Sequence, residues 1–147
     1  MGLTYAQSFL RSRIVTPDNL MVLCRTYEKA NHLGETHEGR FFSDARHCVS
    51  EADLIILAVK PQDSPRMFEQ IRGLAEPSQV FISIMAGVRM EAIARELGVN
   101  KIIRAMPNLP AQIGAGVTAF TSTDPVTRIE LVMVQNLLNT TGKTLYV

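Results

Sequence analysis

Residues 54–62 read Leu-Ile-Ile-Leu-Ala-Val-Lys-Pro-Gln, and residues 102–108 read Ile-Ile-Arg-Ala-Met-Pro-Asn. Each stretch is a short apolar run that stops close to a proline. A parallel strand buried on both faces has a continuous apolar sequence, and proline cannot continue a central strand. Ligands of open parallel α/β sheets lie outside the carboxyl ends of the strands. The two stretches therefore predict two such strands, with Lys60 and Asn108 facing a bound ligand.

The size and charge of the chain fit one globular domain. It has 147 residues, 46% of them hydrophobic, and a net charge of +1. This length allows a proper core, and the charge gives no sign of a nucleic-acid or acidic membrane partner. No apolar run approaches the roughly 20 residues that a membrane helix needs, and residues 1–10 lack the apolar core of a secretory signal. We expect a cytoplasmic domain.

The cysteines and histidines predict neither a disulfide framework nor a metal site. Cys24 and Cys48 both lie in apolar surroundings, so we expect them to be reduced and buried. His32, His37 and His47 have neither zinc-site spacing nor cysteine companions, and we expect them on the surface.

Strand and helix patterns alternate along the chain with short connections. This alternation predicts an α/β fold with a doubly wound, mostly parallel sheet of the Rossmann type. Strands are expected at 20–24, 40–43, 53–59, 80–85, 101–106, 116–120 and 144–147, and helices at 3–14, 27–33, 44–51, from 64, at 89–97 and at 124–139.

The amino end departs from the usual start of a dinucleotide-binding half, which is a strand and a Gly-x-Gly-x-x-Gly turn. Here the chain opens on the first helix, with Gly2 where the third glycine belongs. The absent strand would lie between the strands at 20–24 and 53–59, and without it two apolar edges face nothing. We therefore expect about ten further residues upstream, with two glycines just before Met1. The alternative is that Met1 is the true start and Gly2 an incidental helix-start glycine.

Four stretches carry a resemblance to a known family: 52–61 (Ala-Asp-Leu-Ile-Ile-Leu-Ala-Val-Lys-Pro), 83–88 (Ser-Ile-Met-Ala-Gly-Val), 103–108 (Ile-Arg-Ala-Met-Pro-Asn) and 114–118 (Gly-Ala-Gly-Val-Thr). In order and spacing the chain resembles the amino-terminal domain of pyrroline-5-carboxylate reductase. The resemblance implies a Rossmann domain, residues 1–147, that binds NADP(H). It also implies a following helical domain that builds a homo-oligomer and holds most of the substrate pocket. The reaction implied is reduction of the cyclic imine 1-pyrroline-5-carboxylate to L-proline.

Two residues depart from the family pattern. Leu109 stands where relatives commonly have threonine, and Ala45 stands where many have asparagine near the adenosine. The first change removes a hydroxyl beside the nicotinamide end and leaves the exact substrate open. A related imine or β-hydroxyacid reductase, or a non-catalytic nucleotide-binding regulator, remains an alternative.

Arg25 is the candidate for cofactor selectivity. It ends the second expected strand, where NAD-specific domains place an acid for the ribose 2′-hydroxyl. An arginine there offers a forked, permanent charge to a 2′-phosphate, and Thr26 adds a hydroxyl. The alternative is a solvated strand-end arginine. Glu28 is expected to be a first-turn charge favoured by the helix dipole rather than the missing acid.

Each of the remaining candidate residues can have a structural role or a ligand-binding role. Lys60 with Pro61 is predicted to contact the nicotinamide ribose. Residues 85–87 form either a tight turn or a place where backbone approaches a flat ring, or both. Asn108 either stabilises a turn or contacts the ligand, and Arg104 is expected to pair with a carboxylate rather than to touch the cofactor. With the resemblance, the predicted cofactor-binding residues are Met1, Gly2, Arg25, Thr26, Ala58, Val59, Lys60, Pro61, Ile84, Met85, Ala86 and Asn108.

Overall fold

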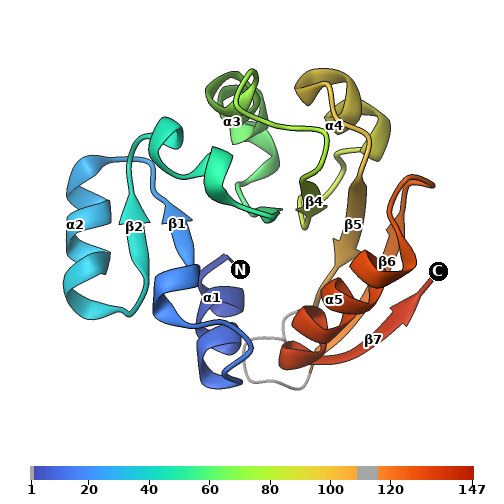
Figure 1. The fold of residues 1–147 in the computed structure, drawn as a ribbon, viewed down its shortest axis with the longest axis horizontal. Coiled ribbons are helices and arrows are strands. Elements are labelled where there is room, and N and C mark those ends of the chain that lie inside the picture. Colours follow the sequence, from blue (N-terminus) through green and yellow to red (C-terminus); the bar gives the residue numbers. More distant parts are fainter. Residues whose placement is uncertain (1, 109–115) are drawn as a thin grey trace.

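The computed structural model of the protein describes residues 2–108 and 116–147 (Figure 1). Met1, Leu109 and part of the stretch 114–118 lie outside the described residues. The strands are β1 (Met21–Leu23), β2 (Arg40–Phe42), β3 (Leu54–Leu57), β4 (Val80–Ser83), β5 (Ile102–Met106), β6 (Gly116–Ser122) and β7 (Gly142–Tyr146). The helices are α1 (Gly2–Arg11), α2 (Tyr27–Thr36), α3 (Ser64–Ile71), α4 (Met90–Leu97) and α5 (Arg128–Leu138).

The strands are mostly parallel, which confirms the Rossmann-type fold class. Within the described residues, β1 and β2 form one small sheet, and the other strands form a second sheet in the order β3-β4-β5-β6-β7. Every pairing is parallel except that of β5 with β6. Parallel neighbours need a crossover connection, which the helices between successive strands supply.

The two sheets are separate because no strand among the described residues pairs with both β1 and β3. β3 lies at the edge of the larger sheet, and its side chains are less buried than those of the neighbouring strand. Its residues Leu-Ile-Ile-Leu are as apolar as those of β4, yet the first three are only half-buried whereas all of β4 is buried. The residues of β1 are likewise half-buried. The strands predicted to lack a shared neighbour therefore do lack one here.

Side chains of alternating strand positions form a core on each face of the larger sheet. On one face, Phe81 and Ile102 pack with Phe68 and Ile71 of α3 and with Ile93 of α4. On the opposite face, Tyr5 and Phe9 of α1 and Val134 of α5 pack against Val80 and Ile103. Figure 1 shows α3 and α4 together at one end of the molecule, with α5 against β6 and β7. A third cluster, built on Cys24, Ala30 and Leu33, joins α2 to the small sheet.

The helix predicted at 44–51 is wrong. The structure has two 3₁₀ turns instead, at Ala45–His47 and Val49–Glu51. The Arg46 amide donates to Asp44 Oδ1 at 3.0 Å, so the predicted capping residue is correct but caps a tighter turn. Hydrogen bonds from Arg46, mainly from its guanidinium, also lower the pKa of Asp44 to about 2.

Two predicted helix starts also need correction. Ser64 is the first residue of α3 rather than its N-cap, and its hydroxyl donates to the Pro61 carbonyl at 2.8 Å. The last helix begins at Arg128 rather than at Asp124, because Thr127 and Glu130 form a capping box that satisfies both backbone amides. The end of α4 at Gly98 is as predicted.

Both cysteines are buried and free, as predicted. His32 and His47 are exposed, whereas His37 is half-buried with its Nδ1 2.8 Å from the Thr36 hydroxyl. Over the described ranges, every helix is too short or too polar to cross a membrane.

Candidate cofactor-binding site

A small cavity of about 110 Å³ lies where β1 and β3 end and α3 begins. Its lining combines apolar side chains, two guanidinium groups and one carboxylate. The lining residues are Leu23, Cys24, Arg25, Val59, Asp63, Arg66, Met67 and Gln70. Arg25 and Val59 were predicted to bind the cofactor. The lining residues of α3 and the turn before it were not predicted: Asp63, Arg66, Met67 and Gln70. Residues at the carboxyl ends of both β1 and β3 line this cavity, and a ligand of an open α/β sheet binds at the carboxyl ends of its strands.

A backbone hydrogen bond fixes the end of β1 where the chain lines the cavity. The Cys24 amide donates to the Phe42 carbonyl at 2.7 Å, which extends the pairing with β2 by one residue. Arg25 follows at once, with an exposed side chain. Burial raises the pKa of the Cys24 thiol, against a smaller opposing effect of Lys29. The thiol is therefore protonated at neutral pH and serves as a wall of the cavity.

Thr26 and Glu28 belong to the start of α2. Thr26 is its N-cap, and its hydroxyl oxygen accepts from the Lys29 amide at 3.1 Å. Glu28 lies in the first turn, as predicted, where a negative charge meets the positive end of the helix dipole. Among the described residues the Thr26 hydroxyl hydrogen has no acceptor, and the predicted contact of Thr26 with a ligand stays a prediction.

Gly2 and Ala58, two predicted site residues, lie against each other. A Cβ placed on Gly2 would be 3.2 Å from the Ala58 Cβ, which is tighter than an ordinary contact. The amino end of α1 thus approaches the residue that follows β3. The first turn of α1 carries no acidic side chain, so its positive end is not neutralised locally. Such a helix start is suited to an anion such as a diphosphate.

The loops after β3 and β4 are tight turns. Lys60 is exposed and precedes a 3₁₀ turn at Pro61–Asp63. The Met85 amide donates to the Ser83 hydroxyl at 3.2 Å, and the Met85 side chain is buried. Gly87 has a φ of +74°, which favours glycine. The tight-turn reading of 85–87 is confirmed, and the approach of a ring to Ile84, Met85 and Ala86 stays a prediction.

Asn108 has a structural role that the sequence left open. Its Oδ1 accepts from the Val117 amide of β6 at 3.1 Å, joining the end of β5 to its antiparallel neighbour. Within the described residues, the side-chain NH₂ group of Asn108 has no hydrogen-bond partner. Contact of Asn108 with a cofactor therefore remains a prediction.

The prediction that Arg104 pairs with a carboxylate is wrong. Within the described residues, Arg104 forms no ion pair, and its Nε is buried without a hydrogen-bond partner. The pairing register places it between Ser83 and Thr121, neither of which is acidic. Ala45 is buried in the core beneath α3 and does not line the small cavity.

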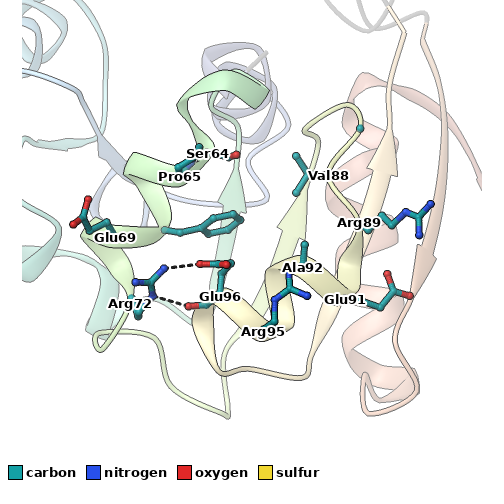
Figure 2. A pocket seen from close by; sticks show the side chains of 12 residues that line it. Ser64, Pro65, Glu69, Arg72, Val88, Arg89, Glu91, Ala92, Arg95 and Glu96 are labelled. Carbon is teal, nitrogen blue, oxygen red and sulfur yellow. Dashed lines mark hydrogen bonds and ion pairs between the residues drawn. The ribbon is translucent and has the colours of Figure 1, made fainter.

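A larger groove of about 730 Å³ lies between α3 and α4 (Figure 2). Figure 2 shows Arg72 reaching Glu96 across it, and the Arg72 Nη2 donates to Glu96 Oε2 at 2.6 Å. Its charged side chains are of both signs, and of the described residues predicted near the cofactor only Gly87, in the stretch 85–87, lines it. Over the parts of the chain that the structure describes, no three His, Cys, Asp or Glu side chains gather in a way that could hold a metal ion.

The fold and the cavity at the ends of β1 and β3 agree with the known proteins to which this chain is similar. Residues 1–87 match the family described as NADP oxidoreductase, coenzyme F420-dependent, and the chain belongs to that family. Among curated proteins, it is similar to pyrroline-5-carboxylate reductases. It is 33% identical to that of Aquifex aeolicus over 147 residues, which cover 99% of this chain and 53% of the relative. It is 31% identical to that of Escherichia coli over 144 residues, covering 97% and 54%.

Solved structures share the fold of this chain. A pyrroline-5-carboxylate reductase from Coxiella burnetii has a TM-score of 0.87 at 25% identity, covering 98% of this chain and 55% of that one. The Plasmodium falciparum pyrroline carboxylate reductase, solved with NADP bound, has a TM-score of 0.85 at 22% identity, covering 100% and 53%. The chain spans about half the length of the curated relatives it matches.

Proposed function

We propose that this chain is the NADP(H)-binding part of an enzyme that reduces 1-pyrroline-5-carboxylate to L-proline. The observation that carries the proposal is the 33% identity to a protein named pyrroline-5-carboxylate reductase over 99% of this chain. The geometry supports the cofactor half of the proposal. Residues predicted from separate stretches of sequence gather at one edge, with Arg25 and Val59 at one cavity and Gly2 against Ala58.

The residues present fit a dinucleotide phosphate. The cavity has apolar walls for a base and a guanidinium for a phosphate. The amino end of α1, where any side chain on Gly2 would crowd Ala58, suits a diphosphate. Lys60 and Pro61, with Ile84, Met85, Ala86 and Asn108, would hold the nicotinamide end.

When bound, the cofactor supplies a hydride for the carbon of the C=N bond, and the nitrogen of the cyclic imine takes a proton from solvent. The part of this chain is to bind and orient the cofactor. Arg25 and Thr26 would hold the adenosine end, and the turns after β3 and β4 would hold the nicotinamide ribose. Fixing both ends orients the reacting atom, which is a large part of what a protein adds to cofactor chemistry.

We also propose that the domain is completed by other protein segments in the working enzyme. A further strand between β1 and β3 would pair with both free edges and bury the half-exposed residues of β3. A helical half would add the substrate pocket and the contacts of a homo-oligomer. The greater length of the curated relatives supports the second point.

The test is a kinetic assay of the natural protein that contains this chain. With 1-pyrroline-5-carboxylate and NADPH, we expect consumption of NADPH matched by formation of L-proline. The 147-residue chain alone is expected to bind the cofactor without appreciable turnover. Turnover with another cyclic imine or a β-hydroxyacid, but not with this substrate, would assign a related reductase. Nucleotide binding with no turnover would indicate a regulator. Robust L-proline formation by the isolated chain would contradict the division of labour proposed here.

A further inference from the structure

We propose that Arg66 is a second arginine for the cofactor's 2′-phosphate and acts together with Arg25. This inference rests on the proposed function, because it assigns a residue to the adenosine end of the same NADP(H) site. Arg66 lies in the first turn of α3, 41 positions after Arg25 in the numbering, and both line the small cavity.

The placement of Arg66 follows from how α3 packs. Asp63, Arg66, Met67 and Gln70 are spaced i, i+3, i+4 and i+7, so they lie along one side of the helix. All of them line the cavity. Phe68 and Ile71 lie on the side that enters the core, and their burial fixes the rotation of α3 about its axis. Because that rotation is fixed, Arg66 is held on the cavity side at the end of β1.

The positive charge of Arg66 is available for a ligand. Within the described residues, neither Arg66 nor Arg25 forms an ion pair, whereas Arg72 and Arg46 are both paired with carboxylates. The described lining of the cavity holds two guanidinium groups and one carboxylate, that of Asp63, so it carries a net charge of +1. A phosphate monoester carries about −1.5 to −2 at pH 7, which a single arginine does not neutralise. Two forked guanidinium groups oppose its charge better than one and offer donors to its several acceptor oxygens.

The ligand class is therefore an adenosine nucleotide with a 2′-phosphate. Leu23, Val59 and Met67 give the cavity apolar walls of the kind that accept a flat base. The Gln70 amide and the Asp63 carboxylate give the polar contacts that fix its edge. A plain anion site would have no need of the apolar walls.

The experiment measures binding of 2′,5′-ADP and of 5′-AMP to the 147-residue chain by calorimetry. These two probes differ by the 2′-phosphate alone and do not need the nicotinamide end. We expect Arg66→Gln to weaken 2′,5′-ADP binding by roughly tenfold or more, the loss of one charge-assisted contact, and to change 5′-AMP binding by less than about twofold. Arg66→Lys should lie between, since lysine keeps the charge and loses the fork. Arg128→Gln, an exposed arginine at the start of α5, is the matched control and should change neither affinity.

The outcomes separate this inference from the function on which it rests. If the unchanged chain binds 2′,5′-ADP more tightly than 5′-AMP and Arg66→Gln does not alter that difference, Arg66 has no part in phosphate binding, although the site stands. If neither the 147-residue chain nor the natural protein that contains it binds either probe, the proposed function fails and this assignment fails with it. In the double variant with Arg25→Gln, the two losses should be less than additive, because both residues hold one group.

Discussion

Replacing Arg25 with aspartate should reverse the preference of the protein between NADPH and NADH. The side chain is exposed and forms no ion pair in the described structure, so the substitution removes no ion pair among the described residues. Stability should therefore stay within about 0.5 kcal/mol, as for ordinary surface changes. The whole effect should appear in ligand binding.

The magnitude follows from the chemistry of the lost contact. A hydrogen bond to a charged group contributes about 1.5–3 kcal/mol, and an aspartate adds repulsion against the phosphate. NADPH should therefore bind roughly 10- to 150-fold more weakly, at about 1.4 kcal/mol per tenfold change. NADH should bind as well or better, because a carboxylate at the end of this strand accepts from the ribose 2′-hydroxyl.

The assay is titration of both reduced cofactors, followed by their fluorescence, in unchanged protein and in Arg25→Asp and Arg25→Lys. The lysine variant keeps the charge without the fork and should retain part of the NADPH preference. Raising the salt concentration should weaken NADPH binding more than NADH binding in unchanged protein. Equal affinities for the two cofactors in unchanged protein, or an NADPH preference that survives Arg25→Asp, would refute the reasoning.

Three further predictions concern other parts of the fold. Gly142→Ala should destabilise the protein by roughly 2–4 kcal/mol in denaturant unfolding, because its Cβ would overlap the backbone of Gly116 and its φ is +139°; an unchanged midpoint would contradict the pairing of β6 with β7. Thr127→Ala should lower stability by about 1 kcal/mol and the Tm by roughly 2–4 °C, since it removes one arm of the capping box with Glu130, and a serine at this position should restore both. Cys24, tested with the other cysteine replaced by serine, should react slowly with iodoacetamide at neutral pH and faster as the pH rises above the ordinary thiol range, because burial raises its pKa. Bound 2′,5′-ADP should slow this reaction further. A reaction rate that depends on neither pH nor ligand would show that the thiol does not line the cavity.

The strands were the most predictable part of the fold. The run 54–59 is apolar without interruption, so the presence of the strand is encoded locally, although β3 ends at Leu57 and not next to Pro61. Start signals for helices compete, and there sequence reasoning went wrong. Pro125 is a good first residue for a helix, but the capping box of Thr127 and Glu130 satisfies more backbone amides and determines the start of α5.

The candidate site was predicted in part. Arg25 could be found because a strand end is visible in the sequence, and the residue type there has a direct chemical meaning. Arg66 and Gln70 were missed because an exposed arginine or glutamine on a helix resembles any other solvated side chain. Arg104 was misread for a related reason, since its neighbours Ser83 and Thr121 are set by strand pairing and not by its place in the sequence.

The sequence by itself determined the alternation of elements, the mostly parallel sheet and the edge at which a ligand would lie, because hydrophobic periodicity, proline and glycine act over a few residues. The tertiary structure decided which side chains share that edge. The cavity joins the end of β1 to one side of α3, segments about 40 positions apart, and its lining depends on the rotation that core packing imposes on α3. Such packing depends on contacts between segments far apart in the sequence, and a local sequence pattern does not predict these contacts.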